Sequence, residues 1–244
     1  MPQPDTAAVA DAIIARLRAE TNAENIAGMA RFGISSHGTL GVSMPVVRKL
    51  AGEAKKALGA RNEVARHELA ARFWASGLHE ARIMAALVDA PELVTDEQAE
   101  AWAADLDSWD VCDQLCINLL RLAPLGWEKA EAWTSRPEEF VKRAGFALGA
   151  TLAVHDKSAG DERFRPLLSA AVREAVDERP MVRKAVNWQV RQIGKRDAAL
   201  NAEAIAACER MLAEHPDSRS ARWIARDALR ELRSDAVRAR LGLG

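Results

Sequence analysis

The sequence predicts an all-α protein, a right-handed α-solenoid (superhelix) of stacked helix pairs with a concave groove. Two observations carry this prediction. Ala, Leu, Arg and Glu, which favour helices, dominate a chain of 244 residues without Tyr, and no stretch sustains the alternation of a half-buried strand. Related segments also recur about every 40 residues, as they do in proteins built from repeated helix pairs.

The repeated segment is a helix that starts with Pro and carries basic residues. Pro-Glu-Glu-Phe-Val-Lys-Arg-Ala at 137–144 is followed 43 residues later by Pro-Met-Val-Arg-Lys-Ala at 180–185. Pro-Val-Val-Arg-Lys-Leu at 45–50 is a third version, and 220–229 again mixes basic and apolar residues. This spacing is typical of HEAT arrays, in which neighbouring helix pairs bury each other's apolar faces. Because no Pro/Gly/Ser-rich linker interrupts the chain, residues 1–244 are predicted to form a single HEAT-like repeat domain.

Apolar periodicity and capping residues predict the individual helices. Capping-box patterns mark two starts, Thr95 with Gln98 and Ser135 with Glu138. Three prolines suit a first helical turn, where their missing N–H would be unpaired anyway: Pro45, Pro137 and Pro180. The predicted helices are 5–20, 23–32, 44–58, 61–75, 79–89, 96–106, 108–122, 126–134, 137–154, 162–176, 180–195, 198–213 and 218–231. The three-glycine segment 33–43 lacks the Gly-Lys-Ser/Thr ending of a phosphate loop and is predicted to connect two helices.

Charge is distributed unevenly along the chain, although the formal net charge is only −1. Residues 89–139 contain 13 acidic and 3 basic residues, whereas residues 140–196 contain 12 basic and 6 acidic residues. This change of sign favours one electropositive surface on a near-neutral protein, with random surface variation as the alternative.

Cysteine usage and hydropathy indicate a cytoplasmic protein without a metal site or a membrane segment. An odd number of cysteines, Cys112, Cys116 and Cys208, argues against a disulfide framework. No nearby Cys or His completes the four ligands that a structural zinc ion needs. No apolar run approaches the ~20 residues that cross a bilayer, and Met1–Asp5 does not resemble a signal peptide.

The first candidate for chemistry is Trp109-Asp-Val-Cys-Asp113. A helical period of about 100° places four residues on one face: Trp109, Asp113, Cys116 and Leu120. The adjoining core arc contains Val111, Leu115, Leu119 and Leu122. Asp113 is therefore predicted at the edge of an apolar face, where it is partly desolvated or lines a groove. The alternative is a structural carboxylate satisfied by a neighbouring helix.

The second candidate is Arg143, at the start of a helix without a single charge from Ala144 to Val154. Such a helix is expected to be buried, and a buried guanidinium needs an acceptor. The acceptor could be a carboxylate such as Asp113, a phosphate, or each in turn. The alternative is a cation at the solvated end of the helix.

The third candidate is the segment 181–196, which has five basic residues and no acidic one. A helix places four of its residues on one face: Lys184, Trp188, Arg191 and Lys195. Cations suit phosphates and an apolar ring suits a sugar or base, so this stripe favours nucleic-acid binding over an ordinary solvated face.

Four segments, in order, resemble the AlkD-type family of DNA alkylation-repair glycosylases. Gly41-Val-Ser-Met-Pro-x-x-Arg48 is similar to the family's early Gly/Pro/Arg signature, and Trp109-Asp-x-x-Asp113 to its catalytic segment. Lys142-Arg143-Ala144 resembles the segment with the active-site arginine, and 182–191, which contains Trp188, the segment with the second tryptophan. The resemblance covers nearly the whole chain.

This resemblance implies a monofunctional DNA glycosylase that releases cationic alkylated purines, 7-methylguanine and 3-methyladenine, from double-stranded DNA. By analogy Asp113 stabilises the cationic sugar and positions water, Trp109 and Trp188 pack on the deoxyribose, and Arg143 holds the backbone. The DNA-binding residues are expected to be Arg48, Lys184, Arg191 and Lys195. A cationic purine leaves as a neutral base, so one carboxylate suffices and no general acid or cofactor is expected.

The expected partner is double-stranded DNA containing alkylated bases, bound by a monomer. Two other functions stay open. One is a non-catalytic HEAT-repeat protein that binds branched or damaged DNA, and the other is a protein-binding solenoid scaffold. The basic stripe disfavours the scaffold, and the joint presence of Trp109, Asp113, Arg143 and Trp188 favours the enzyme.

Overall fold

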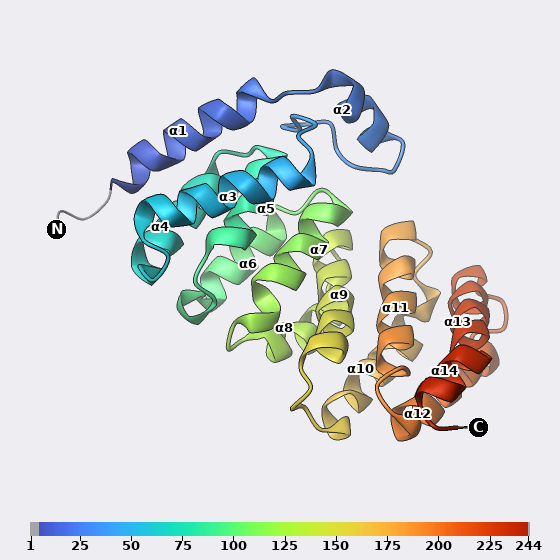
Figure 1. The fold of residues 1–244 in the computed structure, drawn as a ribbon. Helices are drawn as coiled ribbons and strands as arrows, with labels where there is room; N and C mark the ends of the chain where they lie inside the picture. Colours follow the sequence, from blue (N-terminus) through green and yellow to red (C-terminus); the bar gives the residue numbers. More distant parts are fainter. Residues whose placement is uncertain (1–4, 244) are drawn as a thin grey trace. The chain divides into compact units, whose positions relative to one another are not determined.

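The computed structural model describes residues 5–243, which form fourteen α-helices and short 3-10 turns without a β-strand (Figure 1). Backbone contacts divide the chain into two compact units that meet in sequence at Leu125 and Gly126. The predicted all-α class is confirmed, and the single domain stays a prediction. No helix among residues 5–243 is both long and apolar enough to span a bilayer.

In the first unit, α5 lies among α1, α3, α4 and α7. The helices of this unit are α1 (Thr6–Ala19), α2 (Ala23–Ala30), α3 (Met44–Leu58), α4 (Glu63–Ala75), α5 (His79–Val88), α6 (Asp96–Ala104) and α7 (Trp109–Asn118). Helix α5 contacts α3, α4 and α7, and α1 covers α3 and α4. Stacked indoles of Trp74 and Trp102, 4.2 Å apart, add to the core. Leu17, Leu69, Phe73, Met84 and Leu115 are fully buried.

In the second unit, equivalent helices recur at the predicted interval of about 40 residues. The helices of this unit are α8 (Gly126–Ala132), α9 (Glu139–His155), α10 (Arg165–Arg173), α11 (Pro180–Ile193), α12 (Ala198–Glu214), α13 (Arg219–Leu232) and α14 (Asp235–Arg240). Helices α9, α11 and α13 begin at residues 139, 180 and 219 and lie side by side in Figure 1. Asn187 Nδ2 donates to Ile224 O at 3.2 Å, which joins residues 37 apart. The 40-residue period in the sequence therefore corresponds to stacked equivalent helices.

Helix α9 has the buried surroundings that its composition predicts. Every residue from Val141 to Ala153 is buried. A Cβ at Gly145 would lie 2.7 Å from Thr134 N and 2.8 Å from Trp133 C, so only glycine permits this close packing against the preceding backbone.

Helix starts are predicted more accurately than helix ends. Thr95 accepts a hydrogen bond from Gln98 N, as its capping pattern predicts. The pattern of Ser135 with Glu138 is wrong, because Ser135 Oγ instead donates to Ala132 O in a 3-10 turn. Helix α9 therefore begins only at Glu139, after Pro137.

Two further expectations are corrected by the backbone. Leu119 leaves the helical conformation (φ −123°, ψ −68°), so α7 ends at Asn118 rather than at residue 122. The following 3-10 turn points Leu122 outward, where it is 52% exposed instead of part of the core. Helix α14 was not predicted, because a six-residue helix is too short to show apolar periodicity.

Candidate nucleic-acid interface

The predicted site residues divide between the two units. Arg48, Trp109 and Asp113 belong to the first unit. The others belong to the second: Arg143, Lys184, Trp188, Arg191 and Lys195.

Trp109 and Asp113 lie in the first two turns of α7. Both side chains are half-buried, whereas Val111, Cys112 and Cys116 are buried, so the two residues lie at the edge of an apolar face as predicted. Their carboxylate and indole are thus held on a packed helix while part of each faces solvent.

The loop after α2 holds the start of α7. Trp109 Nε1 donates to Phe32 O at 3.1 Å, and Ser35 N donates to the buried Ser108 Oγ at 3.0 Å. The Phe32 ring itself is 73% exposed. The backbone of Phe32 therefore holds the Trp109 indole, while most of the Phe32 residue is exposed to solvent.

This loop is fixed by a buried carboxylate and by glycine geometry. Glu80, only 1% exposed, accepts from Leu40 N at 3.0 Å and from Val42 N at 3.0 Å. Gly41 has φ +72°, and a Cβ there would lie 2.3 Å from Asn22 O. The early glycine is thus required by the loop that positions α7, and the segment 33–43 connects two helices as predicted.

A histidine that sequence reasoning left unassigned also anchors α7. His79 Nε2 lies 2.8 Å from Asp110 Oδ2, and His79 is 3% exposed. Because His79 begins α5 and Asp110 belongs to the first turn of α7, the pair fixes the two helix starts together. Nothing in the 31-residue spacing would have revealed it.

Arg48 is exposed on α3. It forms no ion pair with any residue between 5 and 243, so its guanidinium is available to an anion in solution.

The basic face of α11 holds Lys184, Trp188 and Arg191, whereas Lys195 lies in the turn after the helix, because α11 ends at Ile193 rather than at residue 195. Part of the charge of this surface is neutralised. Lys184 is exposed and Trp188 is half-buried. Arg191 Nη1 lies 2.6 Å and Lys195 Nζ 2.5 Å from the carboxylate of Glu231 on α13. Burial opposes ionisation of Glu231, but hydrogen bonds from both cations outweigh it and hold its pKa below the ordinary value. The segment has no acidic residue of its own, and the neighbouring repeat supplies one.

Arg143 is buried at 5% exposure, which excludes the alternative of a cation at a solvated helix end. Its Nη1 donates to Met181 O at 2.7 Å, so it ties α9 to the first turn of α11.

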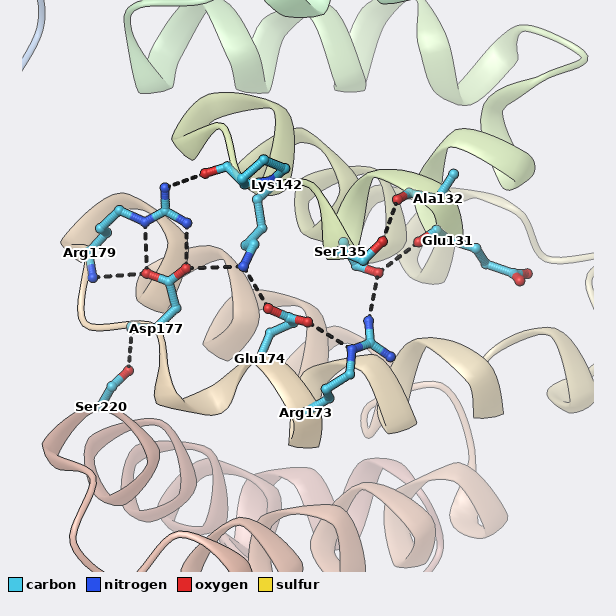
Figure 2. Close-up of polar contacts among 11 residues, drawn as sticks. Glu131, Ala132, Ser135, Lys142, Arg173, Glu174, Asp177, Arg179 and Ser220 are labelled. Carbon is cyan, nitrogen blue, oxygen red and sulfur yellow. Dashed lines mark hydrogen bonds and ion pairs between the residues drawn. The ribbon is translucent and has the colours of Figure 1, made fainter.

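Lys142, which precedes Arg143 in the chain, lies at the centre of a charged network between the repeats (Figure 2). Its Nζ lies 2.6 Å from Glu174 and 3.3 Å from Asp177, while Arg179 binds Asp177 at 2.5 Å. Burial opposes ionisation of Asp177, but hydrogen bonds from Arg179 and Lys142 outweigh it, and the pKa of this carboxyl lies below its usual value. Arg179 Nη1 also donates to Pro137 O at 2.7 Å. The network fixes the start of α11, which carries Lys184.

Comparison with known proteins supports the fold described above and identifies a family. A family model described as DNA alkylation repair enzyme matches residues 13–232. No curated protein sequence matches the chain. One similar solved structure is described as "A new family of proteins related to the HEAT-like repeat DNA glycosylases with affinity for branched DNA structures". It has a TM-score of 0.69 and 15% identity and covers 82% of each chain, so it confirms a HEAT-like repeat fold.

Proposed function

The chain belongs to the DNA alkylation repair enzyme family, and we propose that it hydrolyses the N-glycosidic bond of cationic alkylated purines in double-stranded DNA. The observation that carries this proposal is the half-buried Asp113 on α7, one turn from Trp109, in a chain whose family match spans both units. The products are a free base, 7-methylguanine or 3-methyladenine, and an abasic site.

The chemistry needs few groups. A purine alkylated at N7 or N3 is already positive, so breaking the glycosidic bond releases a neutral base and leaves positive charge on the sugar. The Asp113 carboxylate stabilises that charge and orients the attacking water, which adds a hydroxyl to the sugar and gives up a proton. Trp109 and Trp188 supply flat apolar surfaces for deoxyribose.

DNA binding is assigned to Arg48 of the first unit and to the α11 face of the second. Lys184 is the exposed cation of that face, and Arg191 and Lys195 contribute after exchanging Glu231 for phosphate oxygens. Arg143, held by Met181 O, supports the backbone contacts at the start of α11.

Incubation of the protein with methylated duplex DNA, followed by chromatography of the released bases, tests this function. Free 7-methylguanine and 3-methyladenine above the spontaneous rate are expected. If bases are released only at the spontaneous rate when the protein saturates the duplex, the proposed glycosylase activity is contradicted.

The second candidate is a non-catalytic protein that binds branched DNA, and the description of the similar structure favours it. Titration of a four-way junction and of a duplex of equal length separates the two functions. Tighter binding to the junction without base release supports the non-catalytic DNA-binding protein. Release of bases from methylated duplex supports the glycosylase.

The proposed role of the α11 face predicts how the affinity for duplex DNA depends on salt. Lys184→Gln should weaken duplex binding and reduce the slope of log K against log salt by about 0.9, the value for one phosphate contact. Glu231→Gln should tighten binding, because it frees Arg191 and Lys195 from their ion pairs. Lys157→Gln, at an exposed loop lysine, is the control and should change neither value. If all three variants bind duplex with the affinity and salt slope of the wild type, α11 is not part of the interface.

A second prediction concerns metals. A cationic base requires no Lewis acid to leave, so base release should continue at an unchanged rate in excess chelator. Loss of release that a divalent ion restores would contradict the mechanism.

A further inference from the structure

Helix α13 presents a face of four arginines and one tryptophan to solvent. Its members lie along one side of the helix and line a shallow hollow together with Asp227: Arg219, Arg222, Trp223, Arg226 and Arg230. The opposite side, including Ile224 and Leu232, is fully buried. The α13 face is therefore rigid, because its backbone is fixed by packing.

Two of these arginines carry charge that no neighbour neutralises. Arg219 and Arg226 are exposed, two helical turns apart, and neither forms an ion pair within the described part of the chain. Arg222 donates to Pro216 O at 2.5 Å, and Arg230 pairs with Asp227. Arg219 and Arg226 thus differ from Arg191 on α11, whose charge Glu231 already balances.

Trp223 connects this face to α11. The indole is 39% exposed, and the Arg183 guanidinium lies 4.8 Å from its ring centroid. Lys184, the exposed cation of α11, follows Arg183 in the chain. Helices α11 and α13 pack together, and the Arg183–Trp223 and Arg191–Glu231 contacts join them, so the α13 face lies on the helix next to the basic face of α11.

We propose that the α13 face binds the phosphate backbone of DNA, with Arg219 and Arg226 on phosphates and Trp223 against a sugar or base. This inference rests on the proposed function, in which α11 binds the same DNA. Guanidinium forks bind phosphate through two parallel hydrogen bonds, and an aromatic ring among cations suits nucleic acid better than an acidic peptide.

The test is a salt titration of duplex binding with a double variant, Arg219→Gln with Arg226→Gln. Loss of two phosphate contacts should weaken binding and reduce the salt slope by about 1.8. The matched control is Arg165→Gln with Arg210→Gln, which removes two exposed arginines that pair with Glu203 and Glu214. The control loses the same net charge but should keep the slope. All four arginines are exposed, and circular dichroism should show that both double variants stay folded.

Trp223→Ala tests the ring separately from charge. It should weaken duplex binding while leaving the salt slope unchanged, because no phosphate contact is lost. A Trp223→Phe variant should recover most of the affinity.

Failure of this inference and failure of the proposed function are distinguishable. If the wild type binds duplex and the α13 double variant binds it with the same affinity and slope, the α13 assignment is overturned while the proposed function stands. The same assignment falls if poly-glutamate binding depends on Arg219 and Arg226 but duplex binding does not. If the double variant shows the reduced slope but the wild type releases no base, the α13 assignment stands and the glycosylase does not.

Discussion

Replacing Asp113 with Asn is expected to slow the release of 7-methylguanine about 10²–10³-fold, the usual effect of losing one preorganised electrostatic contact. The substitution keeps the size and polarity of the side chain but removes the negative charge to which the proposed mechanism assigns stabilisation of the sugar cation. DNA binding should persist or tighten, because the phosphate contacts are assigned to other residues. Single-turnover release from methylated duplex, measured beside a binding titration, separates the two effects.

Asp107→Asn is the matched control for Asp113→Asn. Asp107 is an exposed carboxylate in the segment before α7, and its nearest cation, Arg82, is 3.8 Å away. The control removes the same charge from the same region and should release base at the wild-type rate. Equal rates for wild type and Asp113→Asn would make Asp113 a structural carboxylate.

Replacing Asp177 with Asn is expected to lower the free energy of unfolding by about 3 kcal/mol, since it takes one of two carboxylates from the buried Lys142 and the carboxylate from the half-buried Arg179. Asp177 binds Lys142 and Arg179, and its backbone oxygen accepts from Ser220 Oγ at 2.8 Å (Figure 2). The substitution leaves that backbone hydrogen bond in place and removes the carboxylate that joins Lys142 of α9 to the start of α11. Urea unfolding at neutral pH measures the effect.

Glu203→Gln provides the comparison for Asp177→Asn. Glu203 pairs with Arg165 on the exposed surface, where an ion pair contributes less than about 1 kcal/mol. A similar loss of stability in both variants would mean that the network in Figure 2 contributes no more than a surface pair.

The pH dependence of Asp177 has a defined sign. Its pKa is lower in the folded protein than in the unfolded chain, so its contribution is complete above the unfolded value of about 3.9. That contribution is lost as the pH falls through the lowered folded pKa. Wild type should thus lose stability more steeply than Asp177→Asn below about pH 4, and the two should converge.

The sequence alone determined the helical class, the repeat interval and the faces of individual helices. Lys184 and Trp188 could be placed on one side of α11, and Asp113 at the edge of an apolar face, because helical periodicity is a local property. Burial of α9 followed from its lack of charge in the same way. The ends of helices were harder to predict from sequence. In α7 the apolar pattern continues past Leu119, but the backbone leaves the helical conformation at that residue.

Only the tertiary structure decided which side chains meet between repeats. Glu231 lies 40 residues from Arg191, Asp177 lies 35 from Lys142, and Asp110 lies 31 from His79. A repeat period identifies neighbouring helices, but loop lengths and packing set the register that brings particular side chains within hydrogen-bond distance. The same register pairs Arg191 and Lys195 with Glu231 and leaves Arg219 and Arg226 of α13 exposed, because each pairing depends on which residue the adjacent repeat places opposite.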